Sequence, residues 1–244
     1  MAEAAKTNGG GVAATRSQKD RAAYVSPRVT SVKTDRSAKN NINGGLTEAQ
    51  RAAVTAEETR VRKYKTEYAA VIDKDGKVTH RVNSGNAHHV SFEGIPHSDF
   101  KDAVIIHNHP GKGQREAFGN TLATRVGSPL SGQDLVFAAA TDAAEIRATT
   151  YSGDGGGYTY SVRRPKGGWP SMTVRELKNL QARTRNKGQT IANNEFMRVT
   201  LNPSNNYTTD RQRRSRAELM AQWKSIQDMA KALGTTITRK RFNP

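Results

Sequence analysis

The sequence of 244 residues contains no cysteine, and this absence removes three kinds of chemistry at once. Disulfides, thiolate zinc sites and cysteine nucleophiles are all excluded, so a bound metal must use histidine and carboxylate ligands. Long apolar runs are also missing. No segment approaches the roughly 18 apolar residues that cross a membrane, and residues 1–30 hold no apolar stretch typical of an export signal. We therefore expect a cytoplasmic protein with no membrane partner.

Apolar residues in general are scarce, at 34% of the chain. Gly, Asn, Thr and basic residues take their place, which favours one compact domain with poorly packed extensions. We expect residues 1–45 to form a disordered basic arm or linker. Residues 46–165 are then the folded domain, and residues 166–244 a basic, partly helical C-terminal extension.

Acidic residues are few relative to basic ones, and the formal net charge is +17. Residues 1–45 hold eight Lys and Arg against three acids, residues 46–160 thirteen against fourteen, and residues 161–244 eighteen against five. The centre is therefore near neutral and both ends are basic. Basic ends usually indicate a polyanionic partner such as nucleic acid.

One arginine-rich segment in the C-terminal part has two open interpretations. Its side chains could bind phosphate weakly, or they could form a solvated helix face. The residues concerned are Arg211, Arg213, Arg214 and Arg216. Trp169 and Trp223 could stack on bases, but packing against the core is the commoner use of a tryptophan.

Hydrophobic patterning predicts an α/β fold, with a mixed β-sheet flanked by helices. Thr47 and Gln50 fit a capping box that opens the first helix, and the turn at 73–76 joins two strands into a hairpin. In chain order we predict a helix (48–63), the hairpin strands (68–72 and 77–82), a buried strand (103–106), a helix (131–143), two strands (145–152 and 157–162) and two basic helices (173–183 and 211–233).

Two histidines, His107 and His109, follow the buried strand and are separated by one residue. Residues i and i+2 of a strand face the same side, so both imidazoles can reach one ion. Neutral imidazole is a common zinc ligand, and three protein ligands plus water define a catalytic zinc site. Asp134, in the first turn of the next predicted helix, is the best-placed third ligand. Hydrolysis at such a site also needs a general base, Glu or Asp, that carries the proton of the metal-bound water to the leaving amine.

These residues resemble the JAMM motif of the JAB/MPN zinc metalloproteases. The motif is an upstream Glu, then His-x-His-Pro (residues 107–110 here) and Ser-x-x-Asp (residues 131–134). Within this family, the sequence is especially similar to RadC-like and phage-associated JAB domains. The resemblance covers roughly residues 60–165. It implies an MPN/JAB-like fold with a cytidine-deaminase-like layout, and one zinc ion on His107, His109 and Asp134. It further implies Ser131 as the oxyanion stabiliser and Glu67 as the general base.

The resemblance also sets expectations about partners. It implies hydrolysis of a peptide or isopeptide bond, of which a ubiquitin-like tail is one example in the family. A bacterial or phage-encoded chain is expected, cytoplasmic or associated with a virion. One departure is the long loop over residues 111–130 between the two halves of the motif, which is geometrically tolerable because loop entropy grows slowly with length.

Other interpretations of the same residues stay open. Ser131 and Asp134 together also make an ordinary helix cap, and Glu93 competes with Glu67 for the base. His88, His89 and His97 fit loop or surface positions better than ligand positions. Two further function classes remain: a JAB-fold scaffold associated with nucleic acid, and a phage structural or assembly protein that cleaves little or nothing.

Overall fold

The computed structural model describes residues 45–83, 85, 89–110, 129–150, 157–201 and 209–242. The predicted arm up to residue 44, the loop over 111–128 and His88 lie outside the described residues. Within the described part, no helix combines the length and apolarity needed to cross a membrane.

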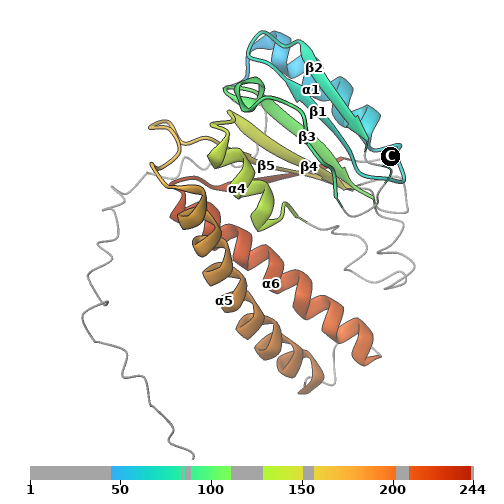
Figure 1. The fold of residues 1–244 in the computed structure, drawn as a ribbon. Coiled ribbons are helices and arrows are strands. Elements are labelled where there is room, and N and C mark those ends of the chain that lie inside the picture. The colour runs from blue at the N-terminus through green and yellow to red at the C-terminus, as the bar shows by residue number, and fades with distance from the viewer. Residues whose placement is uncertain are drawn as a thin grey trace, which may run out of the picture. The chain divides into compact units, whose positions relative to one another are not determined.

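A six-stranded mixed sheet forms the centre, with the strand order β2-β1-β3-β4-β5-β6 (Figure 1). β3 and β4 pair in parallel and the other neighbours pair antiparallel. A parallel pair needs a crossover connection, and α4 (Gly132–Ala140) lies in that connection. The strands are β1 (Tyr68–Ile72), β2 (Val78–Asn83), β3 (Val104–His109), β4 (Glu145–Thr150), β5 (Gly157–Arg163) and β6 (Ile237–Phe242). The predicted α/β class with a mixed sheet is confirmed.

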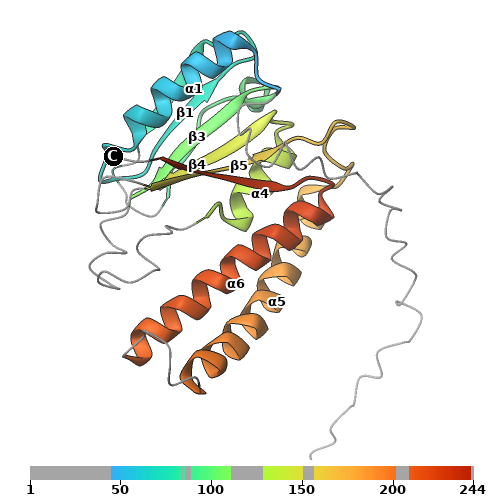
Figure 2. The ribbon, with the colours of Figure 1, turned by 180° about the vertical axis from the view of Figure 1, so that it is seen from behind.

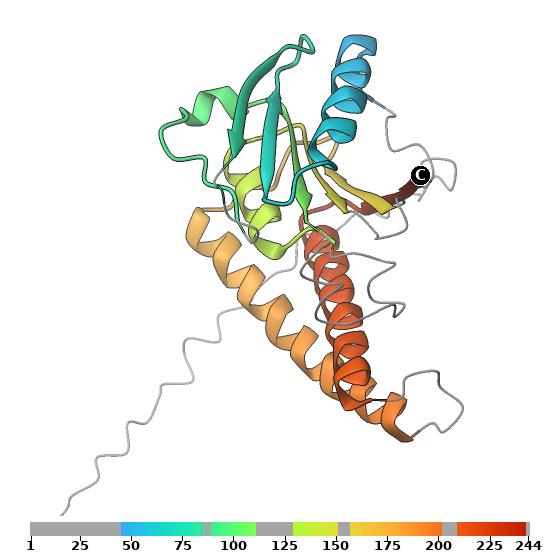
Figure 3. The same ribbon diagram turned by 90° about the vertical axis from the view of Figure 1, so that its right-hand side faces the viewer.

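Helices cover both faces of the sheet, giving three layers (Figures 1, 2 and 3). α1 (Glu48–Val61) packs on one face, where its Val54 and Val61 meet Val104 and Ile106 of β3. The other face carries α4, α5 (Val174–Leu201) and α6 (Asp210–Ala232). Alternate residues of β3 therefore enter different cores, as the two-residue period of a strand requires.

Local sequence explains how the first elements begin and turn. The Thr47 side chain accepts from the Gln50 backbone N–H and the Gln50 side chain accepts in return, so the predicted capping box is present. The hairpin turn is closed by Asp73, whose Oδ1 accepts two backbone N–H groups. Gly76 has a φ of +84°, and a Cβ there would lie 2.6 Å from the Ala49 backbone, so only glycine fits.

The C-terminal part differs from the predicted extension, because it is packed into the main core. Buried side chains of α5 and α6 join the same cluster as Ile105 and Tyr160 of the sheet. They recur at intervals of three or four residues, which is the spacing of a helix face. The contributing residues of the two helices are Leu177, Leu180, Ile226, Met229 and Ala230, and Leu233 directly follows α6.

One further prediction about this part is corrected, and one strand was not predicted. α5 does not end near residue 183 but continues to Leu201, because it packs along α6, and tertiary packing overrides the low helix propensity of Gly and Asn. Any side chain at Gly188 would collide with Ser225 of α6, which shows how closely the two helices approach. The strand β6, which pairs with β5, was not predicted. Its three consecutive cations interrupt the alternation of apolar and polar residues by which a strand is recognised in a sequence.

Candidate metal centre

His107 and His109 lie at the end of β3 and point to the face of the sheet that α4 covers. Ile105, two residues earlier, is buried in the core of that same face. The two Nε2 atoms are 3.0 Å apart and the rings are inclined by 63°. His107 is 4% exposed, and burial lowers its pKa to about 4, with Asp134 opposing and His109 adding to the effect. His107 is therefore neutral at pH 7, which is the form that binds a metal.

Asp134 reaches the histidines from the first turn of α4. Its Oδ2 accepts the Ser131 backbone N–H at 2.6 Å, and the Ser131 hydroxyl oxygen accepts the Asp134 N–H at 3.2 Å. Its other oxygen, Oδ1, lies 3.5 Å from Nε2 of His107. The helix-cap interpretation and the ligand interpretation are thus compatible, because each uses a different carboxylate oxygen. The cap fixes the carboxylate with one oxygen directed at the histidines.

The donor set fits one divalent cation. One ligand atom from each of His107, His109 and Asp134 lies within 4.8 Å of the others. Two imidazole nitrogens and one carboxylate oxygen are the mixture that zinc accepts, and three protein ligands leave a position open. The predicted ligands therefore come together in the structure, across the long loop that separates them in sequence.

Glu67 directly precedes β1 and lines the same cavity as the three ligands. It is 8% exposed, and burial together with repulsion from Asp134 raises its pKa to about 7. Glu93 lines this cavity too, but its side chain is exposed. A carboxyl group whose pKa lies near neutrality suits proton transfer, so burial and pKa make Glu67 a better candidate for a base than the exposed Glu93.

The cavity has a volume of about 490 Å³ and two kinds of wall. The three candidate metal ligands and Glu67 form a polar end. Val90, Phe92, Phe137 and Ile146 form an apolar wall, where Phe92 and Phe137 stack with centroids 5.0 Å apart. His89 also lines the cavity, while His97 lies at the exposed start of the short 3-10 helix η2 (His97–Phe100).

Asn108, between the two histidines, has a role that the sequence analysis did not identify. It points to the opposite face of the sheet and is 2% exposed. Its Nδ2 donates to the carbonyls of Tyr64 and Thr66 at 3.2 and 3.1 Å, and its Oδ1 accepts the Tyr68 N–H at 2.6 Å. These bonds hold the backbone on both sides of Glu67. The signal was the strand period, which places a residue between two same-side ligands on the other face.

The predicted phosphate-binding arginines lie on α6, away from the metal cavity. Arg213 pairs with Asp210 at 2.8 Å, and the Arg214 guanidinium lies 4.9 Å from the Phe196 ring centre. Arg216 is half-buried, and the Arg211 side chain lies outside the described residues. Both tryptophans pack against the core as expected, with Trp169 donating to the Ala143 carbonyl.

Comparison with known proteins adds no relative. No protein-family model, no curated protein and no solved structure matches this chain.

Proposed function

We propose that this protein is a zinc-dependent peptidase or isopeptidase of the JAB/MPN type, with an MPN-like arrangement of the core. The observation that carries the proposal is the convergence of His107, His109 and Asp134 beside the buried Glu67 in one cavity. An ordinary helix cap or a pair of surface histidines would not require a buried carboxylate at the same place. The apolar wall of the cavity supplies room for a substrate side chain.

Each residue then has a defined task. His107, His109 and Asp134 would hold zinc, which when bound supplies an acidified water and polarises the carbonyl of the scissile bond. Glu67 takes the proton of the attacking water and delivers it to the leaving amine. The Ser131 oxygen accepts from the Asp134 N–H, so the Ser131 hydroxyl hydrogen remains free to donate to the oxyanion. The substrate is a protein or peptide, with a ubiquitin-like tail as one member of this class.

Metal content and cleavage together test this proposal. Wild-type protein dialysed against zinc and then against buffer should retain about one ion per chain by mass spectrometry of the metal. His107→Ala should lose it, while the control His97→Ala, on an exposed histidine outside the cluster, should retain it. Glu67→Gln should keep zinc and lose cleavage of a peptide mixture. Wild-type protein without stoichiometric zinc would refute the proposal.

A second candidate is a JAB-fold protein that associates with nucleic acid or serves in virion assembly without cleavage. The observation that favours it is the edge strand β6, where Arg239, Lys240 and Arg241 are consecutive and exposed. Consecutive exposed cations suit a phosphate backbone. Such a protein could act in the cytoplasm of a bacterium or in a phage particle. Retained DNA binding without zinc would favour it over the peptidase.

A further inference from the structure

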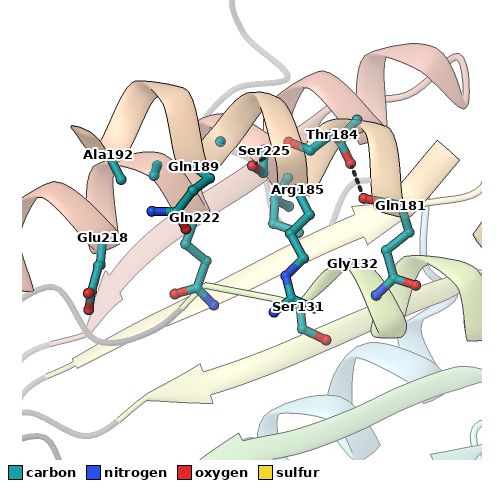
Figure 4. A pocket seen from close by; sticks show the side chains of 13 residues that line it. Ser131, Gly132, Gln181, Thr184, Arg185, Gln189, Ala192, Glu218, Gln222 and Ser225 are labelled. Carbon is teal, nitrogen blue, oxygen red and sulfur yellow. Dashed lines mark hydrogen bonds between the residues drawn. The ribbon is translucent and has the colours of Figure 1, made fainter. Parts of the chain in front are cut away.

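A second cavity lies beside the metal centre, between the start of α4 and the paired helices α5 and α6 (Figure 4). Its volume is about 350 Å³. Ser131 lines both cavities, while Gly132 faces the second one and Asp134 the first. The two cavities therefore lie on either side of Ser131, the proposed oxyanion donor, at the N-terminus of α4. We name the second cavity the α5–α6 groove.

The walls of the α5–α6 groove carry polar side chains that are available to a ligand. Gln181, Gln222, Arg185 and Glu218 line it, and among the described residues their side chains make no hydrogen bond or ion pair. A glutamine amide offers both donors and acceptors, which is the pattern that matches a peptide backbone. By contrast, Thr184 and Ser225 are satisfied within the helix pair.

Most residues in the floor of the groove are small. Gly188, Ala192 and Ala221 are buried there, together with Ile226. Small side chains let a bound chain lie close to the helices, where the glutamines can reach its backbone. A bound peptide can therefore lie close to the helices, where the glutamine amides can donate hydrogen bonds to its backbone and accept them from it.

The charges of the groove select among possible occupants. Arg185 is balanced by Glu218, so the lining carries no net charge, although residues 161–244 as a whole are strongly basic. Nucleic acid binding needs an excess of cations along the backbone, which this lining lacks. A neutral polar groove that shares Ser131 with the metal cavity suits a polypeptide chain whose scissile bond lies at the metal.

We propose that the α5–α6 groove binds an extended segment of the polypeptide substrate, on one side of the scissile bond, by hydrogen bonds from Gln181 and Gln222 to its backbone. The inference rests on the proposed peptidase function for its substrate class. It assigns the C-terminal helices a part in substrate binding that the metal motif alone does not contain.

Cross-linking tests the groove without requiring hydrolysis. Because the chain has no cysteine, one introduced thiol can be labelled with a benzophenone maleimide at a single place. Gln189→Cys puts the label at the groove, and Thr190→Cys is the matched control, since it is the next exposed residue of α5 but does not line the groove. Both are made in the full chain with Glu67→Gln and zinc, and are irradiated with a biotinylated library of random decapeptides. Equal melting curves control for folding.

The proposal expects biotin transfer at position 189 about fivefold above position 190. Adding Gln181→Ala and Gln222→Ala should reduce transfer by about fivefold or more, the effect of losing one or two hydrogen bonds. Unlabelled peptides should compete and a single-stranded DNA 20-mer should not. Equal transfer at both positions, or competition by DNA as strong as by peptide, overturns the proposal. Selective transfer with no cleavage by wild-type protein would support the groove and refute the peptidase, whereas cleavage with equal transfer would do the reverse.

Discussion

Residues 46–160 and residues 161–244 differ in charge and in chemistry, yet they share one core. The first segment is near neutral and holds the candidate metal ligands, whereas the second holds eighteen Lys and Arg against five acids. Nevertheless Leu177 and Met229 of the second segment are as buried as Ile105 of the first. The net charge of a segment therefore describes its surface and not whether it is packed into the core. A few apolar residues at helical spacing suffice to place it in the fold.

The largest effect on stability should come from breaking this shared core. Met229→Ala removes a fully buried side chain and should lower the free energy of unfolding by about 2–5 kcal/mol, as Ile105→Ala should in the first segment. Met197→Ala is the matched control, since Met197 is 54% exposed, and it should change stability by less than about 0.5 kcal/mol. Urea denaturation followed by circular dichroism measures all three. Two separate transitions would show that the segments fold independently.

The pH dependence of stability tests the buried carboxyl group of Glu67, which belongs to the first segment. The pKa of Glu67 is raised to about 7 in the folded chain, so its contribution to stability is fully present below pH 4.5 and is lost as pH rises through 7. Metal-free wild-type protein should therefore lose up to about 3 kcal/mol relative to Glu67→Gln between pH 4.5 and 8. Urea midpoints measured with a chelator test this. The shift of His107 acts in the opposite direction, but it is present in both proteins.

Asn108 should affect both the stability of the fold and the proposed activity of Glu67, although it lies on the other face of the sheet from the two histidines. Asn108→Ala leaves the buried Tyr68 N–H and two carbonyls without their partner, which should cost about 1–3 kcal/mol. If Glu67 acts as proposed, kcat for a cleaved peptide should also fall, while zinc content stays near one. Asn179→Ala, on an exposed asparagine of α5, is the control. Loss of zinc together with activity would instead place the role of Asn108 in metal binding.

The smallest effect should belong to the basic surface of the second segment. We expect Arg214→Ala combined with Arg216→Ala to change stability by about 1 kcal/mol or less, because the lost contacts are the cation–π pair of Arg214 and the attraction between the half-buried Arg216 and Glu195. Weak binding to a DNA duplex should become less salt-dependent, with the slope falling by about one per phosphate contact removed. Fluorescence anisotropy at several salt concentrations measures it. An equal change in Lys101→Ala, on an exposed residue of the first segment, would contradict a binding face on α6.

Elements with local signals were predictable from the sequence. The capping box at Thr47, the turn at Asp73 and the apolar run that ends in His107 each depend on neighbouring residues. α5 was predicted too short, because Gly188 is a poor helix former in isolation and is needed only where Ser225 approaches. β6 was missed because its stability comes from pairing with β5, which is distant in sequence.

The spacing of His107 and His109, together with the cap that orients Asp134, is determined by the sequence alone, since both follow from the periods of a strand and a helix. Only the tertiary structure brought those two parts together across the loop, buried Glu67 beside them and raised its pKa. The same is true of the α5–α6 groove, where Gln181 and Gln222 face one cavity from two different helices. The physical reason is that burial and long-range contacts depend on how whole helices and strands pack together. This packing cannot be predicted from the pattern of neighbouring residues.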